Sequence, residues 1–69
     1  MTNAFASALE ISAQIIRANL SEPTVARRLI TERMHAYSPE SVEANDYLRN
    51  MQEGYKAVLA GMYAMGAAG

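Results

Sequence analysis

The spacing of the apolar residues limits the fold more than any other feature of the sequence. In the first segment, from Phe5 to Leu20, they stand at i, i+3, i+4 and i+7, the spacing of an amphipathic helix. No stretch alternates apolar and polar residues with the two-residue period of a strand. The sequence therefore predicts an all-α protein with one small domain over residues 1–69. The expected helices cover about residues 3–20, 22–37 and 39–66.

Two prolines divide this pattern. Pro23 removes a backbone donor, so it either starts a new helix or kinks the old one. The apolar stripe keeps nearly the same face across Pro23, which leaves both alternatives open. The second break is cleaner, because Ser38 can cap a helix whose first residue is Pro39. We expect a helical hairpin whose first arm is kinked or broken at Pro23.

The last expected helix carries a stripe of small residues beside its large apolar stripe. Glycine costs a helix interior about 1 kcal/mol relative to alanine, so two glycines here need a reason. Small residues let two helix backbones approach closely, and we expect this stripe to pack against a second copy. The alternative is a tight crossing within one chain. The residues of this small-residue stripe are Gly54, Ala57, Gly61, Ala64 and Ala68.

The size and composition of the chain favour packing against a second copy over a tight crossing within one chain. A chain of 69 residues has a thin core, and small domains compensate with disulfides, metals or oligomerisation. The sequence has no cysteine and one histidine, so oligomerisation is left, and we expect a homodimer. The net charge of −1 argues against nucleic acid as the main partner. The most apolar stretch is shorter than the roughly 20 residues that span a membrane.

No set of residues indicates catalysis. His35 stands alone, so the usual histidine and cysteine ligands of a metal site are missing from one chain. Glu43 and Asp46 have no base or nucleophile placed beside them by the sequence, and they suit the solvated start of a helix. We expect neither an enzyme nor a cofactor.

The middle segment suggests a surface that binds another protein. Arginine and tyrosine are enriched at interface hot spots, and an arginine within an apolar stripe, such as Arg33, must reach out of it or find a partner. The expected partner-binding residues are Arg27, Arg33, Met34 and Tyr37. The stretch LSEPTVARRLITERM also resembles the second half of a helix-turn-helix, although Asn19 stands where such turns favour glycine. DNA binding is therefore the alternative.

The whole sequence of 69 residues, which has no cysteine, resembles a known group of small helical proteins. The segment ISAQIIRANLSEPTVARRLITERMHAYSPESVEANDYL, followed by the small-residue helix, is similar to the anti-quorum-sensing proteins that Pseudomonas phages express early to disarm their host. The resemblance implies a dimeric inhibitor of a LuxR-type regulator, and also of the type IV pilus assembly ATPase, acting in the host cytoplasm. A fainter likeness is to helical co-chaperones of type III secretion needle subunits.

Overall fold

Helices form where the apolar spacing predicts them. The computed structural model describes residues 3–65, and within this range it contains helices and connecting turns but no strand. The all-α class is therefore confirmed. The helices are α1 (Ala4–Ala18), α2 (Pro23–Met34), α3 (Pro39–Ala44) and α4 (Asp46–Ala64).

Side-chain caps fix where three of these helices begin. The Asn3 side chain accepts from the Ala6 amide at the start of α1. At the start of α3, the Ser38 hydroxyl accepts from the Ser41 amide and Pro39 takes the first helical position, as the sequence predicted. Asn45 caps α4 in the same way. Each cap satisfies a backbone donor that has no partner within its helix.

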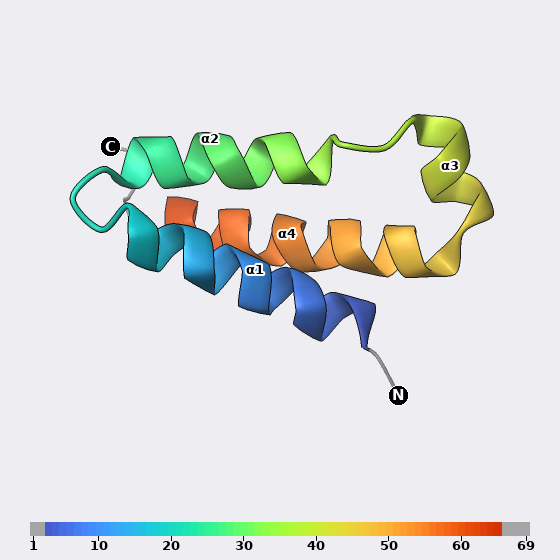
Figure 1. The fold of residues 1–69 in the computed structure, drawn as a ribbon, viewed down its shortest axis with the longest axis horizontal. Helices are drawn as coiled ribbons and strands as arrows, with labels where there is room; N and C mark the ends of the chain where they lie inside the picture. The colour runs from blue at the N-terminus through green and yellow to red at the C-terminus, as the bar shows by residue number, and fades with distance from the viewer. Residues whose placement is uncertain (1–2, 66–69) are drawn as a thin grey trace.

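At Pro23 the chain breaks and reverses, so the kinked alternative does not occur. Asn19 ends α1, with its side-chain amide donating to the Ile15 carbonyl at 2.9 Å. The Glu22 amide then donates to the Asn19 carbonyl at 2.9 Å, which closes a turn directly before Pro23. Where one bent arm was expected over residues 3–37, α1 and α2 run in opposite directions (Figure 1).

The helix expected over residues 39–66 is divided at Asn45. This residue has an extended backbone, with φ −132° and ψ 110°, and its side-chain oxygen accepts from the amides of Tyr47 and Leu48. Asparagine competes with helix continuation in this way because its short side chain bonds to nearby backbone groups. The single helix was therefore a wrong expectation, and α3 turns away from α4 at a corner of the molecule (Figure 1).

The three longer helices enclose one small core. Helices α1 and α4 run in the same direction, α2 runs opposite to both, and α3 lies at one end (Figure 1). Ile30 of α2 is fully buried at the centre, where it meets α1 and α4. The core is therefore shared by three helices of one chain. Its buried members are Ala8, Ile30, Tyr55 and Leu59.

The small-residue stripe divides into two parts. Gly54 is buried against α1, where an added Cβ atom would lie 2.7 Å from the Ala8 Cβ and 2.8 Å from the Phe5 carbonyl oxygen. At this position the close packing lies within the chain. Gly61 instead has no atom within 4 Å of an added Cβ, and Ala57 and Ala64 are exposed. Ala68 lies outside the described residues.

None of the helices in the described range is both long enough and apolar enough to cross a bilayer.

Candidate functional site

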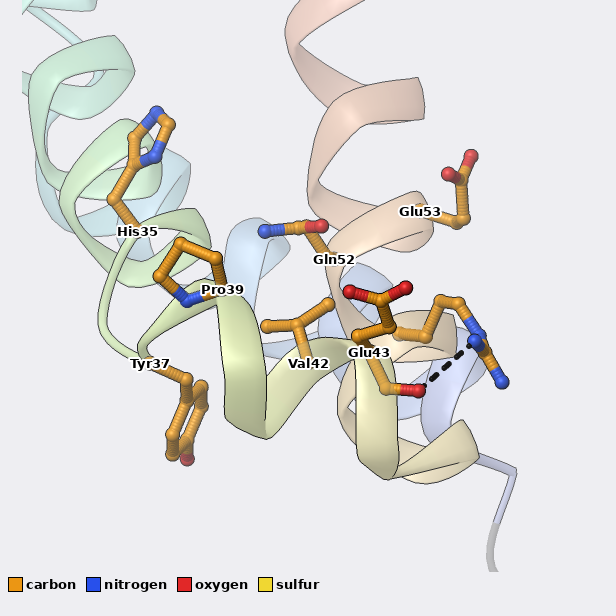
Figure 2. Close-up of a pocket in the computed structure, with 8 residues that line it drawn as sticks. His35, Tyr37, Pro39, Val42, Glu43, Gln52 and Glu53 are labelled. Carbon is orange, nitrogen blue, oxygen red and sulfur yellow. Dashed lines mark hydrogen bonds between the residues drawn. The ribbon is translucent and has the colours of Figure 1, made fainter.

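A groove lies at the corner where the end of α2, helix α3 and the beginning of α4 meet. Its volume is about 510 Å³, within the range of about 300–1,000 Å³ that is typical of ligand sites. We call it the corner groove, and Figure 2 shows the side chains around it. Its lining residues are His35, Tyr37, Pro39, Val42, Glu43, Arg49, Gln52 and Glu53.

Apolar side chains from the α2–α3 connection and α3 form one part of this lining. Tyr37 precedes the Ser38 cap and Pro39 opens α3, so both residues stand in the lining beside the start of this helix, with the Tyr37 ring directed away from Val42 and Glu43 (Figure 2). Val42 lies one turn further along α3 and is half-buried. Tyr37 is 48% exposed, between Tyr47 at 43% and Tyr63 at 58%. This part of the groove can cover an apolar group.

The charged part of the lining is mostly acidic. Arg49 is held by its neighbours. One guanidinium nitrogen donates to the Glu43 carbonyl at 3.3 Å (Figure 2), and the other pairs with the Asp46 carboxylate. Among residues 3–65 no ion pair involves the Glu43 carboxylate. The Glu53 carboxylate lies 3.7 Å from the Lys56 ammonium, in a solvent-exposed pair of little strength. Both glutamates belong to the lining of the groove.

Gln52 ties the two walls of the groove together. Its side-chain amide donates to the Met34 carbonyl at 3.1 Å, which links α4 to the last residue of α2. This carbonyl belongs to the last turn of α2, where backbone acceptors have no partner within the helix. The hydrogen bond thus satisfies an acceptor and fixes the width of the groove.

Three of the four expected partner-binding residues lie together beside the groove. Arg33, Met34 and Tyr37 line a closed cleft between the end of α2 and α4 that is too narrow to admit a water molecule, and Tyr37 lines both this cleft and the corner groove. Met34 is half-buried and packs against the core, whereas Arg33 and Tyr37 are exposed. The surface available to a partner is therefore formed by Arg33 and Tyr37.

At the base of the cleft lies Tyr55, which is only 3% exposed. Burial raises the pKa of its hydroxyl above the usual 10.0, while the positive charge of Arg33 opposes this shift. The neutral tyrosine is thus the form that the folded protein favours.

Arg27 lies away from this cluster. Its guanidinium carbon is 5.1 Å from the centre of the Tyr63 ring, near the other end of α2. One of its guanidinium nitrogens is buried without a hydrogen-bond partner among the described residues. Stacking on Tyr63 therefore holds Arg27 within the fold, and the structure does not bring it to the corner groove.

The sequence did not point to Val42, Glu43, Gln52 and Glu53 as neighbours. A usable signal was present, since Ser38-Pro39 and Asn45-Asp46 are two helix starts separated by one short segment. Two helix starts this close together indicate that the chain changes direction between them. Side chains on either side of such a corner lie near one another. Within residues 3–65 no three histidine, cysteine or acidic side chains gather closely enough to hold a metal ion.

Comparison with known proteins gives no relative: no family model, no curated protein and no solved structure matches this chain.

Proposed function

We propose that this protein acts by binding another protein, and that the corner groove together with Arg33 forms its binding surface. The observation that carries the proposal is the position of Tyr37. Its ring is half-exposed on the boundary between the groove and the cleft that contains Arg33. Tyrosine and arginine beside a preformed concavity are the side chains that dominate binding energy at protein interfaces.

The resemblance to phage proteins suggests the identity of the partner. On that basis the protein is an inhibitor of a host LuxR-type regulator, and also of the type IV pilus assembly ATPase, and it acts in the host cytoplasm without catalysis or cofactor. Occupying a functional surface of the partner would be enough to inhibit it.

Affinity capture with matched variants tests this proposal. Tagged protein is incubated with nuclease-treated bacterial lysate, and the captured proteins are identified and quantified by mass spectrometry. We expect Tyr37→Ala and Arg33→Ala each to reduce a stoichiometric partner about tenfold, the loss typical of interface hot spots. Gln14→Ala, at an exposed position of α1 that does not line the corner groove, is the control. Equal capture by all four proteins would show that the surface is wrongly placed.

Nuclease treatment separates this function from DNA binding. If capture depends on intact nucleic acid, the helix-turn-helix alternative is favoured over a protein partner. A direct titration with DNA would then show the steep dependence on salt that phosphate contacts produce.

We also propose that the exposed part of the small-residue stripe supports a homodimer. Ala57, Gly61 and Ala64 leave one face of α4 open, and Phe5 and Leu9 of the adjacent α1 are each 39% exposed. Gly61→Leu adds a bulky side chain to this face, at a position where an added Cβ atom has open space within its own chain. We expect it to lower the mass measured by light scattering from dimer to monomer. An unchanged mass would exclude this face as the dimer interface.

A further inference from the structure

We infer that Arg33 and the hydroxyl of Tyr55 form a site for a carboxylate, which an acidic side chain of the partner protein supplies. This inference rests on the proposed function and adds the chemistry of the partner at that surface. It is carried by two groups that line one cleft, an arginine without an ion pair and a buried tyrosine without a hydrogen bond from its hydroxyl within residues 3–65.

The first group is the Tyr55 hydroxyl. The residue is only 3% exposed, and it lines the cleft between the end of α2 and α4. A buried tyrosine hydroxyl generally has a hydrogen-bond partner, because burial without one sacrifices the hydration of the group. Among residues 3–65 no backbone or side-chain group forms a hydrogen bond with this hydroxyl. The cleft therefore holds a donor whose acceptor has to come from outside the chain.

The Tyr55 ring lies at the base of the cleft, whereas its hydroxyl lies near exposed side chains. Burial raises the pKa of the hydroxyl, the charge of Arg33 lowers it, and Tyr37 and Tyr47 raise it further. Because electrostatic effects weaken with distance, these three side chains lie near the hydroxyl. All three are exposed. A ligand therefore meets the hydroxyl at the mouth of the cleft, which is itself too narrow for a water molecule.

The second group is the Arg33 guanidinium. It forms no ion pair within residues 3–65, not even with Glu32, which precedes it in the chain. Among the described residues that line the cleft, Arg33 is the only charged one. The ring of Tyr37, which also lines the cleft, is directed away from Glu43 of the corner groove (Figure 2). The mouth of the cleft therefore presents a positive charge to an approaching ligand.

A carboxylate matches these two donors. A guanidinium group can donate two parallel N–H bonds to one carboxylate, and a phenol can donate its O–H to the same group. The Tyr55 phenol keeps this proton at neutral pH, since burial raises its pKa above 10.0. A cationic side chain would be repelled by Arg33, and a neutral amide of the same shape would lack the charge that the guanidinium binds.

A titration with short peptides tests the inference on the whole protein. The probe is the blocked tripeptide acetyl-Leu-Glu-Leu-amide, and the control probe is acetyl-Leu-Gln-Leu-amide, which has the same shape without the charge. Binding is followed by nuclear magnetic resonance of the isotope-labelled protein. We expect the glutamate peptide to shift the Arg33 side-chain signal and the Tyr55 amide signal with saturation at tens of millimolar, and added salt to weaken the effect. The glutamine peptide should bind about tenfold more weakly.

Variants make the test specific for the two donors. Arg33→Gln should abolish saturation by the glutamate peptide. Tyr55→Phe keeps the ring and removes only the hydroxyl, so it should weaken binding about tenfold through loss of a charge-assisted hydrogen bond. Arg28→Gln and Tyr63→Phe, at exposed positions that do not line the cleft, should leave binding unchanged. Equal affinity for both peptides, or unchanged affinity in Tyr55→Phe, would overturn the inference, as would a glutamate peptide that causes no saturating shift.

The capture assay distinguishes failure of this inference from failure of the proposed function. If Tyr37→Ala reduces capture while Tyr55→Phe retains it in full, the binding surface is correctly placed and the carboxylate site is wrong. If neither change affects capture, the binding surface itself is wrong.

Discussion

Gly54 of α4 lies so close to Ala8 of α1 that a Cβ atom at this glycine would be 2.7 Å from the alanine Cβ. It would also lie 2.8 Å from the Phe5 carbonyl oxygen, which belongs to the backbone and cannot rotate away. This contact sets the distance between the two helices that share most of the core. Glycine is therefore required at this position for packing, although it weakens the helix that contains it.

The two glycines of α4 should consequently respond in opposite directions to the same substitution. Gly54→Ala overpacks the contact with α1 at a cost of about 1–3 kcal/mol, which exceeds its gain in helix propensity of about 1 kcal/mol. Within one chain Gly61→Ala meets open space, so at a protein concentration low enough to keep the chain monomeric it should raise the free energy of unfolding by up to about 1 kcal/mol. Urea unfolding followed by circular dichroism at one protein concentration measures both. A stabilised Gly54→Ala variant would show that the helices are not closely packed there.

Ser12 should be replaceable by alanine with a gain in stability. Its hydroxyl is fully buried and has no hydrogen-bond partner among the described residues, so the folded state has lost the hydration of this group without compensation. We expect Ser12→Ala to raise the free energy of unfolding by about 0.5–1.5 kcal/mol, measured by thermal and urea unfolding.

Ser7→Ala on the same helix is the control, because this serine is only partly buried and can gain little beyond helix propensity. A loss of stability in Ser12→Ala would mean that the buried hydroxyl forms a hydrogen bond after all.

Asn45 should be needed for the corner between α3 and α4. Asn45→Ala removes the side-chain acceptor for the Tyr47 and Leu48 amides, and loss of such a cap costs about 1 kcal/mol. We expect a lower free energy of unfolding and no increase in helix content by circular dichroism. Asn50→Ala, at an exposed position within α4, should be neutral or slightly stabilising. Increased helix content in Asn45→Ala would indicate that α3 and α4 join into one helix.

Tyr55 should make the protein sensitive to alkaline pH. Its pKa is raised in the folded state by burial, so the unfolded chain loses its proton first, near pH 10.0, while the folded protein still holds it. Stability should therefore fall as the pH rises through and above 10.0. Tyr55→Phe cannot ionise and should lose less stability between pH 10 and 11 in urea titrations. Tyr63→Phe, at an exposed tyrosine that does not act on the Tyr55 hydroxyl, is the control and should behave as the wild type; identical pH profiles for all three proteins would contradict this account.

The sequence predicted which segments are helical better than it predicted where the helices break and in which directions they run. Helical spacing and the Ser38-Pro39 start are local, and both were correctly interpreted. At Pro23 the apolar face continues unchanged, so periodicity could not distinguish a kink from the reversal that the turn at Asn19 produces. The break at Asn45 was missed because the residues on both sides of it favour a helix, whereas one side-chain hydrogen-bonding group decides the outcome.

The candidate site was predictable only in part for the same reason. Arg33 and Tyr37 could be selected from the properties of their side chains. The meeting of Tyr37 with Glu43 and Glu53 at one corner depends on the direction in which α3 leaves α2, which apolar spacing does not encode. Arg27 resembled Arg33 in the sequence, but the fold places it on the Tyr63 ring.

Photochemical crosslinking in bacterial cells tests most directly whether the corner groove is the binding surface. Photoreactive benzoylphenylalanine is introduced in place of Tyr37, at the rim of the groove, or in place of Gln14, on the exposed face of α1. We predict that irradiation joins a partner protein to the chain from position 37 and not from position 14. Crosslinking from position 14 alone, equal yields from both positions, or no product from either would contradict the account.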